Sequence, residues 1–217
     1  MDPSVIVRSG YDAMSSRYLE ARLRGIDELP LVRELCRLVP AGRLVLDAGC
    51  GAGVPLTKHL AESYRVLGVD FSLGQLRLAS ELAPMASYAC QDLAHLGIAR
   101  ASVDAICSFY AIIHIPRSRH ARLIRDLLDL LKPGGYALLC LGTEDIEEDF
   151  GTYQGVPMYW SHFDAKANVS MVSEIGFTIT RSLTVRDPID EAGSHLFVLA
   201  QKPGFRELRL RPPARQP

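Results

Sequence analysis

Three aspartates stand where predicted buried strands end, and a glycine-rich turn follows the first of them. Asp47 closes the apolar stretch Leu44–Leu46, and the chain then reads D-A-G-C-G-A-G as far as Gly53. The glycines of this turn carry no Cβ, so its backbone can approach a ligand closely. Asp70 ends a second strand and Asp92 follows a third. A carboxylate beside such a turn would repel a pyrophosphate but suits a ligand that carries an ammonium group.

The glycine spacing argues against the two common phosphate-binding motifs. A dinucleotide fingerprint G-x-G-x-x-G beginning at Gly49 requires glycine where Val54 stands, and one beginning at Gly51 requires glycine at Leu56. The Walker pattern requires Gly-Lys followed by Ser or Thr, and no such sequence follows the turn. A strand, a glycine turn and a helix with Pro55 at its first position still form the opening unit of a nucleotide-binding α/β domain.

The motif D-x-G-x-G-x-G resembles motif I of the class I S-adenosylmethionine (SAM)-dependent methyltransferases, whose cofactor carries an amino acid and no phosphate. Three later stretches resemble the same family in the same order: G-V-D-F-S around Asp70, Cys90–Leu93, and L-K-P-G-G at 131–135. The resemblance implies a three-layer Rossmann-like α/β sandwich with a mostly parallel seven-stranded sheet and an antiparallel last strand. The alternative interpretation of the first motif is a glycine-rich turn with a surface aspartate.

The resemblance also assigns the contacts to the cofactor. Asp70 lies 17 residues after Gly53, near the offset at which nucleotide folds place a carboxylate on ribose hydroxyls. In the family, the acid after the third strand accepts a hydrogen bond from the adenine amino group, and the next backbone amide meets a ring nitrogen. Asp92 and Leu93 match those positions. The expected cofactor-binding residues are Tyr11, Tyr18, Asp47, Gly49, Cys50, Gly51, Asp70, Phe71, Ser72, Asp92, Leu93, Ser108 and Phe109.

Residues 1–40 are expected to form an N-terminal helical cap. Apolar residues recur at helical spacing over Val5–Leu23, and a second helix is expected over Ile26–Val39. Many small methyltransferases open with a similar Tyr-Asp…Tyr segment that folds over the bound cofactor, which would place Tyr11 and Tyr18 there. The alternative is an amphipathic helix that only packs on the sheet.

The methyl acceptor is expected at the end of the fourth strand, under the long connection 142–164. The sequence Cys107–Tyr110 lacks the Asn/Asp-Pro-Pro-aromatic motif of enzymes that methylate DNA bases or protein glutamine, so those subfamilies are excluded. The aromatic-rich connection predicts a lid or substrate loop, with an aromatic plug over the sheet edge as the alternative. The expected substrate residues are Tyr110, Tyr159, Trp160 and His162, and the candidate catalytic bases are His114 and His162. Either histidine could instead be a hydrogen-bonded residue that lines a loop.

Composition limits the remaining classes of function. A net charge of −1 gives no basic field for nucleic acid or anionic membrane, and no apolar run approaches the length of a membrane span. Five widely separated cysteines without C-x-x-C predict reduced core thiols in a cytoplasmic protein, with no disulfides and no metal. We expect one domain over residues 1–203 and a flexible Arg/Pro-rich tail over 204–217.

The function predicted from these features is transfer of a methyl group from SAM to an N, O or C atom of a small molecule by direct displacement. The product would be S-adenosylhomocysteine (SAH). Three alternatives stay open at this point. One is a SAM-binding protein that does not transfer methyl, and a less favoured one is a nicotinamide-dependent oxidoreductase. The third and weaker one is a nucleic-acid methyltransferase, since the sequence has no basic stripe. No nucleic acid or membrane partner is expected, and the sequence leaves the oligomeric state open.

Overall fold

A computed structural model describes residues 2–24, 29–187 and 193–204 of the protein. The strands are β1 (Leu44–Ala48), β2 (Arg65–Asp70), β3 (Ser87–Cys90), β4 (Val103–Ser108), β5 (Leu131–Gly142), β6 (Ile146–Tyr153), β7 (Val156–His162), β8 (Thr178–Arg186) and β9 (Ser194–Gln201). The α-helices are α1 (Pro3–Arg24), α2 (Leu29–Leu38), α3 (Leu56–Ala61), α4 (Leu73–Leu82), α5 (His120–Leu130) and α6 (Ala165–Ile175). Short 3₁₀ turns are η1 (Leu93–His95), η2 (Ile112–His114) and η3 (Arg117–Arg119).

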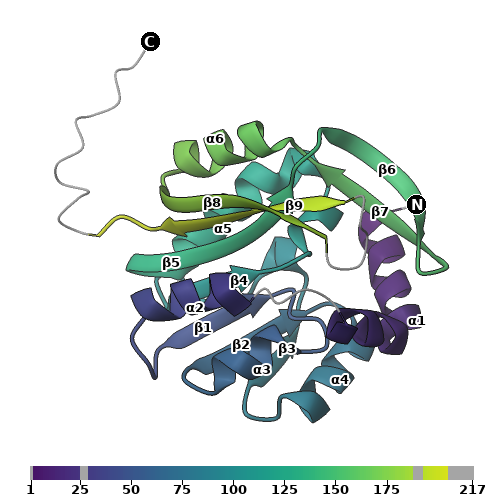
Figure 1. Ribbon diagram of the computed structural model, residues 1–217, viewed down its shortest axis with the longest axis horizontal. Helices are drawn as coiled ribbons and strands as arrows, with labels where there is room; N and C mark the ends of the chain where they lie inside the picture. Colours follow the sequence, from purple (N-terminus) through teal and green to yellow (C-terminus); the bar gives the residue numbers. More distant parts are fainter. Residues whose placement is uncertain (1, 25–28, 188–192, 205–217) are drawn as a thin grey trace.

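Seven strands form one twisted sheet in the order β3-β2-β1-β4-β5-β9-β8 (Figure 1). Strands β1 to β5 pair in parallel, and β9 runs antiparallel to both β5 and β8. This confirms the predicted mostly parallel seven-stranded sheet with an antiparallel last strand. The chain moves outward through β2 and β3 and then crosses back to β4. The strand order therefore reverses between β1 and β4, where open α/β sheets leave a crevice at the carboxyl ends.

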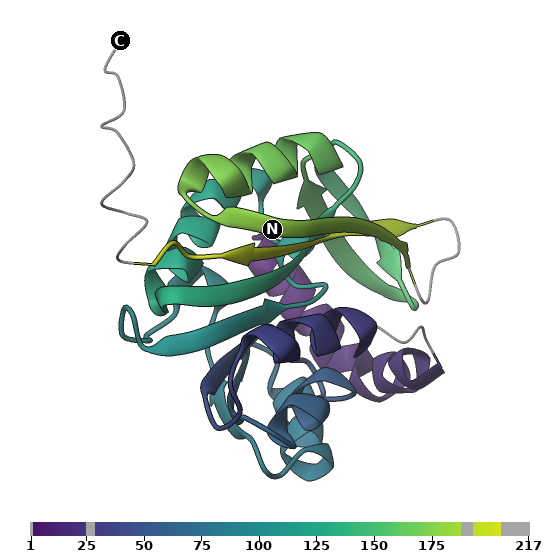
Figure 2. The ribbon, with the colours of Figure 1, turned by 60° about the vertical axis from the view of Figure 1, so that its left-hand side comes forward.

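Helices cover both faces of the sheet because alternate strand residues point to opposite sides. Leu46 of β1 packs in one apolar cluster with Leu127 of α5 and Val172 of α6. Its neighbour Val45 packs in the opposite cluster with Leu35 of α2. Figure 2 shows α6 lying along the two antiparallel strands β8 and β9. The three-layer sandwich predicted from the family resemblance is therefore the observed architecture. None of the described helices is long and apolar enough to cross a membrane.

The segment 142–164 differs most from the expectation, because it is an ordered β-hairpin rather than an irregular loop. Strands β6 and β7 pair only with each other and turn through Gln154 and Gly155, both with positive φ. A two-residue turn of this kind matches the twist of antiparallel strands. Most residues of β6 are exposed and several are acidic, so the strand lacks the apolar alternation by which strands are recognised in a sequence.

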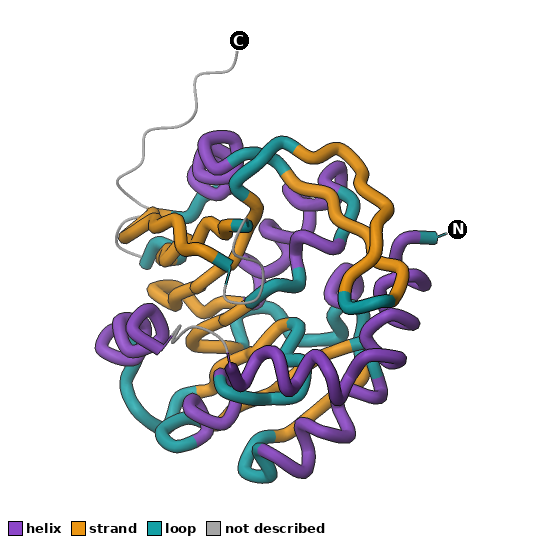
Figure 3. Tube along the Cα trace, turned by 45° about the vertical axis from the view of Figure 1, so that its right-hand side comes forward, coloured by secondary structure: helices purple, strands orange, loops and turns teal. Residues whose placement is uncertain are grey.

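The hairpin packs against the N-terminal helix. Figures 1 and 3 show β6 and β7 beside α1 at one edge of the molecule. A Cβ at Gly10 of α1 would lie 2.9 Å from the carbonyl oxygen of Pro157, so glycine permits this close approach. Met158 and Tyr159 of β7 are buried together with Val7 and Met14 of α1 in a small third cluster. The cluster fixes both elements above the carboxyl ends of the parallel strands.

Two local sequence patterns differ from the structure. Pro-Gly-Gly is typical of a turn, but β5 begins at Leu131 and contains the L-K-P-G-G stretch as a bulge in its pairing with β4. The sequence S-L-G-Q at 72–75 is typical of a capping box, and Ser72 does accept a hydrogen bond from the backbone amide of Gln75, but its own amide donates to Asp70. The reciprocal half of the box is therefore absent. Residues 1, 25–28, 188–192 and 205–217 lie outside the described residues, and they include the start of the expected helix 26–39 and most of the expected tail.

Candidate functional site

Two cavities meet at the carboxyl ends of β1 and β4. The strand-end cavity, of about 380 Å³, lies between α1 and the loops that follow β1, β2, β3 and β4. The hairpin cavity, of about 360 Å³, lies between α1, the β6–β7 hairpin and the region where β8 ends and β9 begins. Both volumes are in the range of small-molecule sites. The residues common to both cavities are Tyr11, Tyr18, Tyr110 and His114.

Asp70 organises the glycine turn at the floor of the strand-end cavity. Its Oδ2 accepts a hydrogen bond from the Gly51 amide and its Oδ1 accepts one from the Ser72 amide, both at 2.9 Å. Desolvation raises the pKa of the Asp70 carboxyl, while these amides favour its ionised form. A carboxylate offers about four lone-pair sites, so each oxygen can accept one more hydrogen bond from a ligand. Asp70 is thus suited to bind a pair of hydroxyl groups.

Asp47 presents a buried acceptor without a partner. Only 1% of the residue is exposed, and its Oδ2 accepts a hydrogen bond from the Thr57 hydroxyl at 2.5 Å. Its Oδ1 is buried and has no hydrogen-bond partner among the described residues. Burial raises the pKa of the carboxyl to about 7, and the nearby Asp70 adds to the shift. Asp47 also lines a small side cavity together with Cys50 and Gly51.

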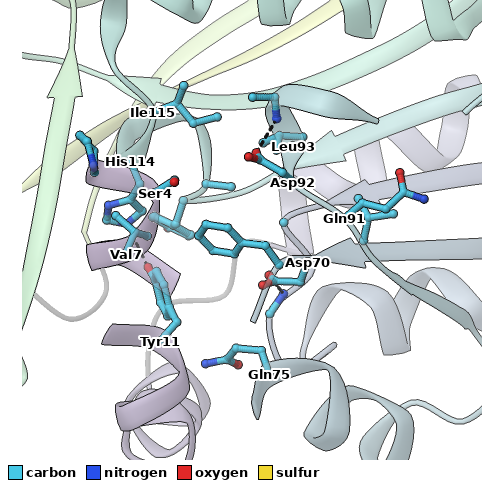
Figure 4. A pocket seen from close by; sticks show the side chains of 18 of the residues that line it. Ser4, Val7, Tyr11, Asp70, Gln75, Gln91, Asp92, Leu93, His114 and Ile115 are labelled. Atoms are coloured by element: carbon cyan, nitrogen blue, oxygen red, sulfur yellow. Dashed lines mark hydrogen bonds between the residues drawn. The ribbon is translucent and has the colours of Figure 1, made fainter. Parts of the chain in front are cut away.

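The far end of the strand-end cavity follows β2 and β3. Asp92 Oδ1 accepts a hydrogen bond from the Ala94 amide at 2.8 Å, and Leu93 and Phe71 line the cavity beside it. Figure 4 shows Tyr11 and His114 on one side of this cavity and Asp70 and Asp92 on the other. A planar ligand group could lie between Phe71 and Leu93 with its polar edge toward Asp92.

The helix α1 is held over the strand-end cavity by Asp12. Its Oδ1 accepts hydrogen bonds from the Ser72 hydroxyl at 2.6 Å and from the Gly74 amide at 2.9 Å. The preceding residue of the helix, Tyr11, lines both cavities. The helix that carries Tyr11 therefore lies over the strand-end cavity.

His114 is held in one tautomer by two hydrogen bonds. Its Nδ1 lies 2.7 Å from the carbonyl oxygen of Tyr159, which can only accept, so Nδ1 carries the proton. Its Nε2 lies 3.0 Å from the Tyr11 hydroxyl, which donates to it. Burial lowers the pKa of His114 to about 4, so the ring is neutral at pH 7. His114 thus connects α1 to the hairpin at the junction of the two cavities.

Tyr110 lies at the centre of this junction. Its φ is 54°, a left-handed conformation that costs a residue other than glycine about 1–2 kcal/mol. The guanidinium of Arg22 lies 4.4 Å from the centre of its ring. Strained residues of this kind are concentrated at ligand sites.

The structure brings most, but not all, of the expected residues to the cavities. Trp160 and His162 line the hairpin cavity, and Phe109 lines the strand-end cavity. Three of the expected residues, Ser72, Ser108 and Tyr159, are fully buried and lie outside the cavity linings. The Ser108 hydroxyl donates a hydrogen bond to the carbonyl of Ala48. The backbone carbonyl of Tyr159 accepts a hydrogen bond from His114.

Several lining residues are not expected from the sequence. Gln75 is 1% exposed, lines the strand-end cavity, and has neither amide atom hydrogen-bonded among the described residues. Arg22, Asp149, Asp187 and His195 line the hairpin cavity. The four residues of the hairpin cavity belong to no motif, and they come together only through the packing of α1, the hairpin and the β8–β9 end.

Residues 45–135 match a family model described as a methyltransferase domain. Over 102 residues the chain is 36% identical to 2-methyl-6-phytyl-1,4-hydroquinone methyltransferase from Synechocystis sp., covering 45% of this chain and 31% of that protein. It is 31% identical over 146 residues to a ubiquinone biosynthesis O-methyltransferase from Xanthomonas axonopodis pv. citri, covering 59% and 57% of the two chains. A SAM-dependent methyltransferase from Methanosarcina mazei has a similar structure, with a TM-score of 0.71, 20% identity, and 82% and 100% of the two chains covered.

The fold is that of an open α/β domain, and its two cavities lie at the switch point of the sheet. Residues 45–135 thus match a methyltransferase domain in sequence, and the described chain has the same fold as the SAM-dependent methyltransferase from Methanosarcina mazei. The chain spans about a third of the length of the first curated relative.

Proposed function

We propose that the protein binds SAM in the strand-end cavity and transfers its methyl group to a small molecule in the hairpin cavity, releasing SAH. The observation that carries the proposal is that two cavities of similar size meet at the carboxyl ends of β1 and β4. The relatives named above methylate small molecules according to their names, which supports an acceptor of that kind.

The residues present fit SAM. The unpartnered Oδ1 of Asp47 is a buried acceptor for an ammonium group, and the free lone pairs of Asp70 suit ribose hydroxyls. A Cβ at Gly51 would meet only Gln75 Oε1, at 3.7 Å, so the glycine leaves space that a ligand can fill. Asp92 and Leu93 would bind the adenine edge, as the family resemblance implies.

The chain contributes positioning to the reaction. SAM supplies a methyl group on a positively charged sulfur, and displacement requires the acceptor atom to approach in line. Tyr11, Tyr18 and Tyr110 surround the junction where that approach would occur, and aromatic faces stabilise a nearby cation. The helix α1 lines both cavities, and the hairpin lines the one on the acceptor side of the junction. A base is needed only when the acceptor must lose a proton.

His114→Ala is expected to reduce the methyl-transfer rate about a hundredfold with little change in SAM affinity. The substitution removes the neutral imidazole that holds the Tyr11 hydroxyl and the Tyr159 carbonyl at the junction. Single-turnover kinetics and calorimetry measure the two quantities. Tyr11→Phe serves as the comparison, since an equal loss there would show that His114 acts by orienting Tyr11. A large loss of SAM affinity in His114→Ala would contradict a role in the transfer step.

SAM affinity is expected to rise with pH toward about 7 and then to level off. The carboxyl of Asp47 in the free protein has a pKa of about 7, so below that pH it must release a proton before it can pair with an ammonium group. Asp70 also faces Asp47 and disfavours its ionised form. Calorimetry across this pH range should show the rise in the natural protein and not in Asp47→Asn. Parallel pH profiles for the two proteins would contradict this role of Asp47.

The function is tested by giving the protein methyl-labelled SAM together with a small-molecule fraction of a cell extract. We expect SAH to form and the label to appear in low-molecular-weight products, and we expect SAM but not NAD to bind in calorimetry. Binding of SAM without transfer of label would favour the alternative of a regulatory SAM-binding protein. Binding of NAD in place of SAM would favour an oxidoreductase.

We also propose that the protein acts in the cytoplasm as a single domain over residues 1–203, without a nucleic acid partner. All five cysteines are free thiols, which suits a reducing compartment. The near-neutral net charge of −1 argues against a surface for nucleic acid.

A further inference from the structure

The hairpin cavity has more acidic than basic lining residues. Its described lining contains the carboxylates of Glu144, Asp149 and Asp187 and one guanidinium, that of Arg22. Glu144 and Asp149 come from the hairpin side and do not line the strand-end cavity. Carboxylates therefore outnumber guanidinium groups in the described lining of the hairpin cavity.

The histidines add hydrogen-bond acceptors to this lining. His162 Nδ1 lies 2.7 Å from the Glu144 carbonyl oxygen and must donate to it, which leaves the lone pair on Nε2. Burial lowers the pKa of His162, which favours this neutral form. His195 Nε2 lies 2.6 Å from Asp187 Oδ2 and donates to it, and its Nδ1 is buried without a partner among the described residues. The Nε2 lone pair of His162 thus offers an acceptor to a ligand that brings its own N–H donor.

Aromatic rings complete the lining. Tyr153 and Trp160 meet edge to face with centroids 6.4 Å apart, and Trp160 also lies 5.9 Å from the His114 ring. Such faces pack against a planar ring and also attract a cation. Carboxylates and aromatic faces in one cavity therefore both favour a ligand that has a planar ring and a positive charge.

The positions of the acidic and the aromatic lining residues also favour one orientation of a bound ligand. The four residues at the junction with the strand-end cavity are tyrosines and a neutral histidine, whereas Glu144 and Asp149 lie at the hairpin. A positive charge held at the hairpin is kept away from the sulfonium of SAM, which limits repulsion between the two cations.

We propose that the hairpin cavity binds an aromatic acceptor with an amine group, with the amine at the hairpin acids and the nucleophilic atom at the Tyr110 junction. This inference rests on the proposed methyl transfer and names the class of its acceptor. It excludes acceptors that carry a carboxylate or phosphate in the place of the amine.

The protein contains one tryptophan, Trp160, so its fluorescence reports on this cavity alone. Tyramine and 4-hydroxyphenylacetate share a phenol ring and differ in bearing an ammonium or a carboxylate group. Titration of the SAH-loaded protein should show tyramine binding at least about tenfold more tightly. Equal affinity, preference for the carboxylate, or no binding of tyramine would overturn the proposal.

Two substitutions locate the amine. Glu144→Gln and Asp149→Asn should each weaken tyramine binding up to about fivefold, since exposed charges interact modestly. Asp126→Asn removes an exposed charge from α5, outside both cavities, and should leave tyramine affinity unchanged. Equal effects of all three substitutions would overturn the assignment. SAH binding, measured separately by calorimetry, tests the proposed function itself, so the failure of one conclusion is distinguished from the failure of the other.

Discussion

Gly51→Val is expected to abolish SAM binding while the protein remains folded. The residue has a φ of 53°, where a side chain costs about 1–2 kcal/mol, which a stable domain can tolerate. A single Cβ would have room beside Gln75, at 3.7 Å. The two methyl groups of valine would extend further, into the space in which the ligand must approach the turn. We expect no calorimetric signal with SAM or SAH and a thermal unfolding transition that stays cooperative.

The control for this substitution is Gly42→Val. Gly42 has a φ of 76°, and a Cβ added there would meet no described atom within 4 Å. It lies in the turn before β1, away from both cavities. The two variants therefore carry similar backbone strain, and only one of them obstructs the site. Equal SAM affinity in both variants would show that the glycine turn is only structural. Gly49 is a poor choice, because a Cβ there would collide with Ala111 and disturb the fold.

Asp70→Ala is expected to weaken SAM binding by about 2 kcal/mol or more, which is about thirtyfold in Kd. The substitution removes a charged acceptor from the ribose hydroxyls and also releases the amides of Gly51 and Ser72. Asp70→Asn keeps the shape of the side chain but has one oxygen in place of two. It should lose less affinity than Asp70→Ala, because the remaining oxygen can still accept.

The same calorimetric titration with Asp126→Asn supplies the control. This residue is an exposed partner of Arg122 on α5, and its substitution should leave SAM affinity unchanged. An unchanged Kd in a folded Asp70→Ala protein would remove Asp70 from the site.

The cofactor half of the site could be predicted because its residues are local to the strands. Asp47, Asp70 and Asp92 each belong to the end of a parallel strand or follow it, and parallel strands bring their carboxyl ends to one edge. Their spacing from the glycine turn is therefore enough to group them. The position of Gln75 in the cavity lining could not be predicted from the sequence. A capping box would have its side chain accept a hydrogen bond from the Ser72 amide. In the structure Asp70 accepts that hydrogen bond, and Gln75 lines the cavity.

The lining of the hairpin cavity, where the methyl acceptor is proposed to bind, could not be predicted in the same way. His195 begins a strand, which places it far from a site built on the ends of parallel strands. However, β9 runs antiparallel, and its first residues pair with the last residues of β5, so His195 lies opposite Gly142. Asp187 follows β8, which points the same way as β5, and thus meets His195 at the same edge. Only the order of the strands in the sheet brings these two residues together.

The self-contained pairing of β6 with β7 makes the hairpin an exchangeable module. Its backbone ladder is separate from the seven-stranded sheet, and it lies outside the stretch 45–135 that matches the family model. Its retained anchors would be the Tyr159 carbonyl on His114 and the Ser161 hydroxyl that accepts from the Arg117 amide. With these positions and the close contacts of Pro157 and Met158 with α1 kept, the exposed residues of the module can be varied as a library. Selection for new acceptors can then proceed without altering the residues that line the strand-end cavity.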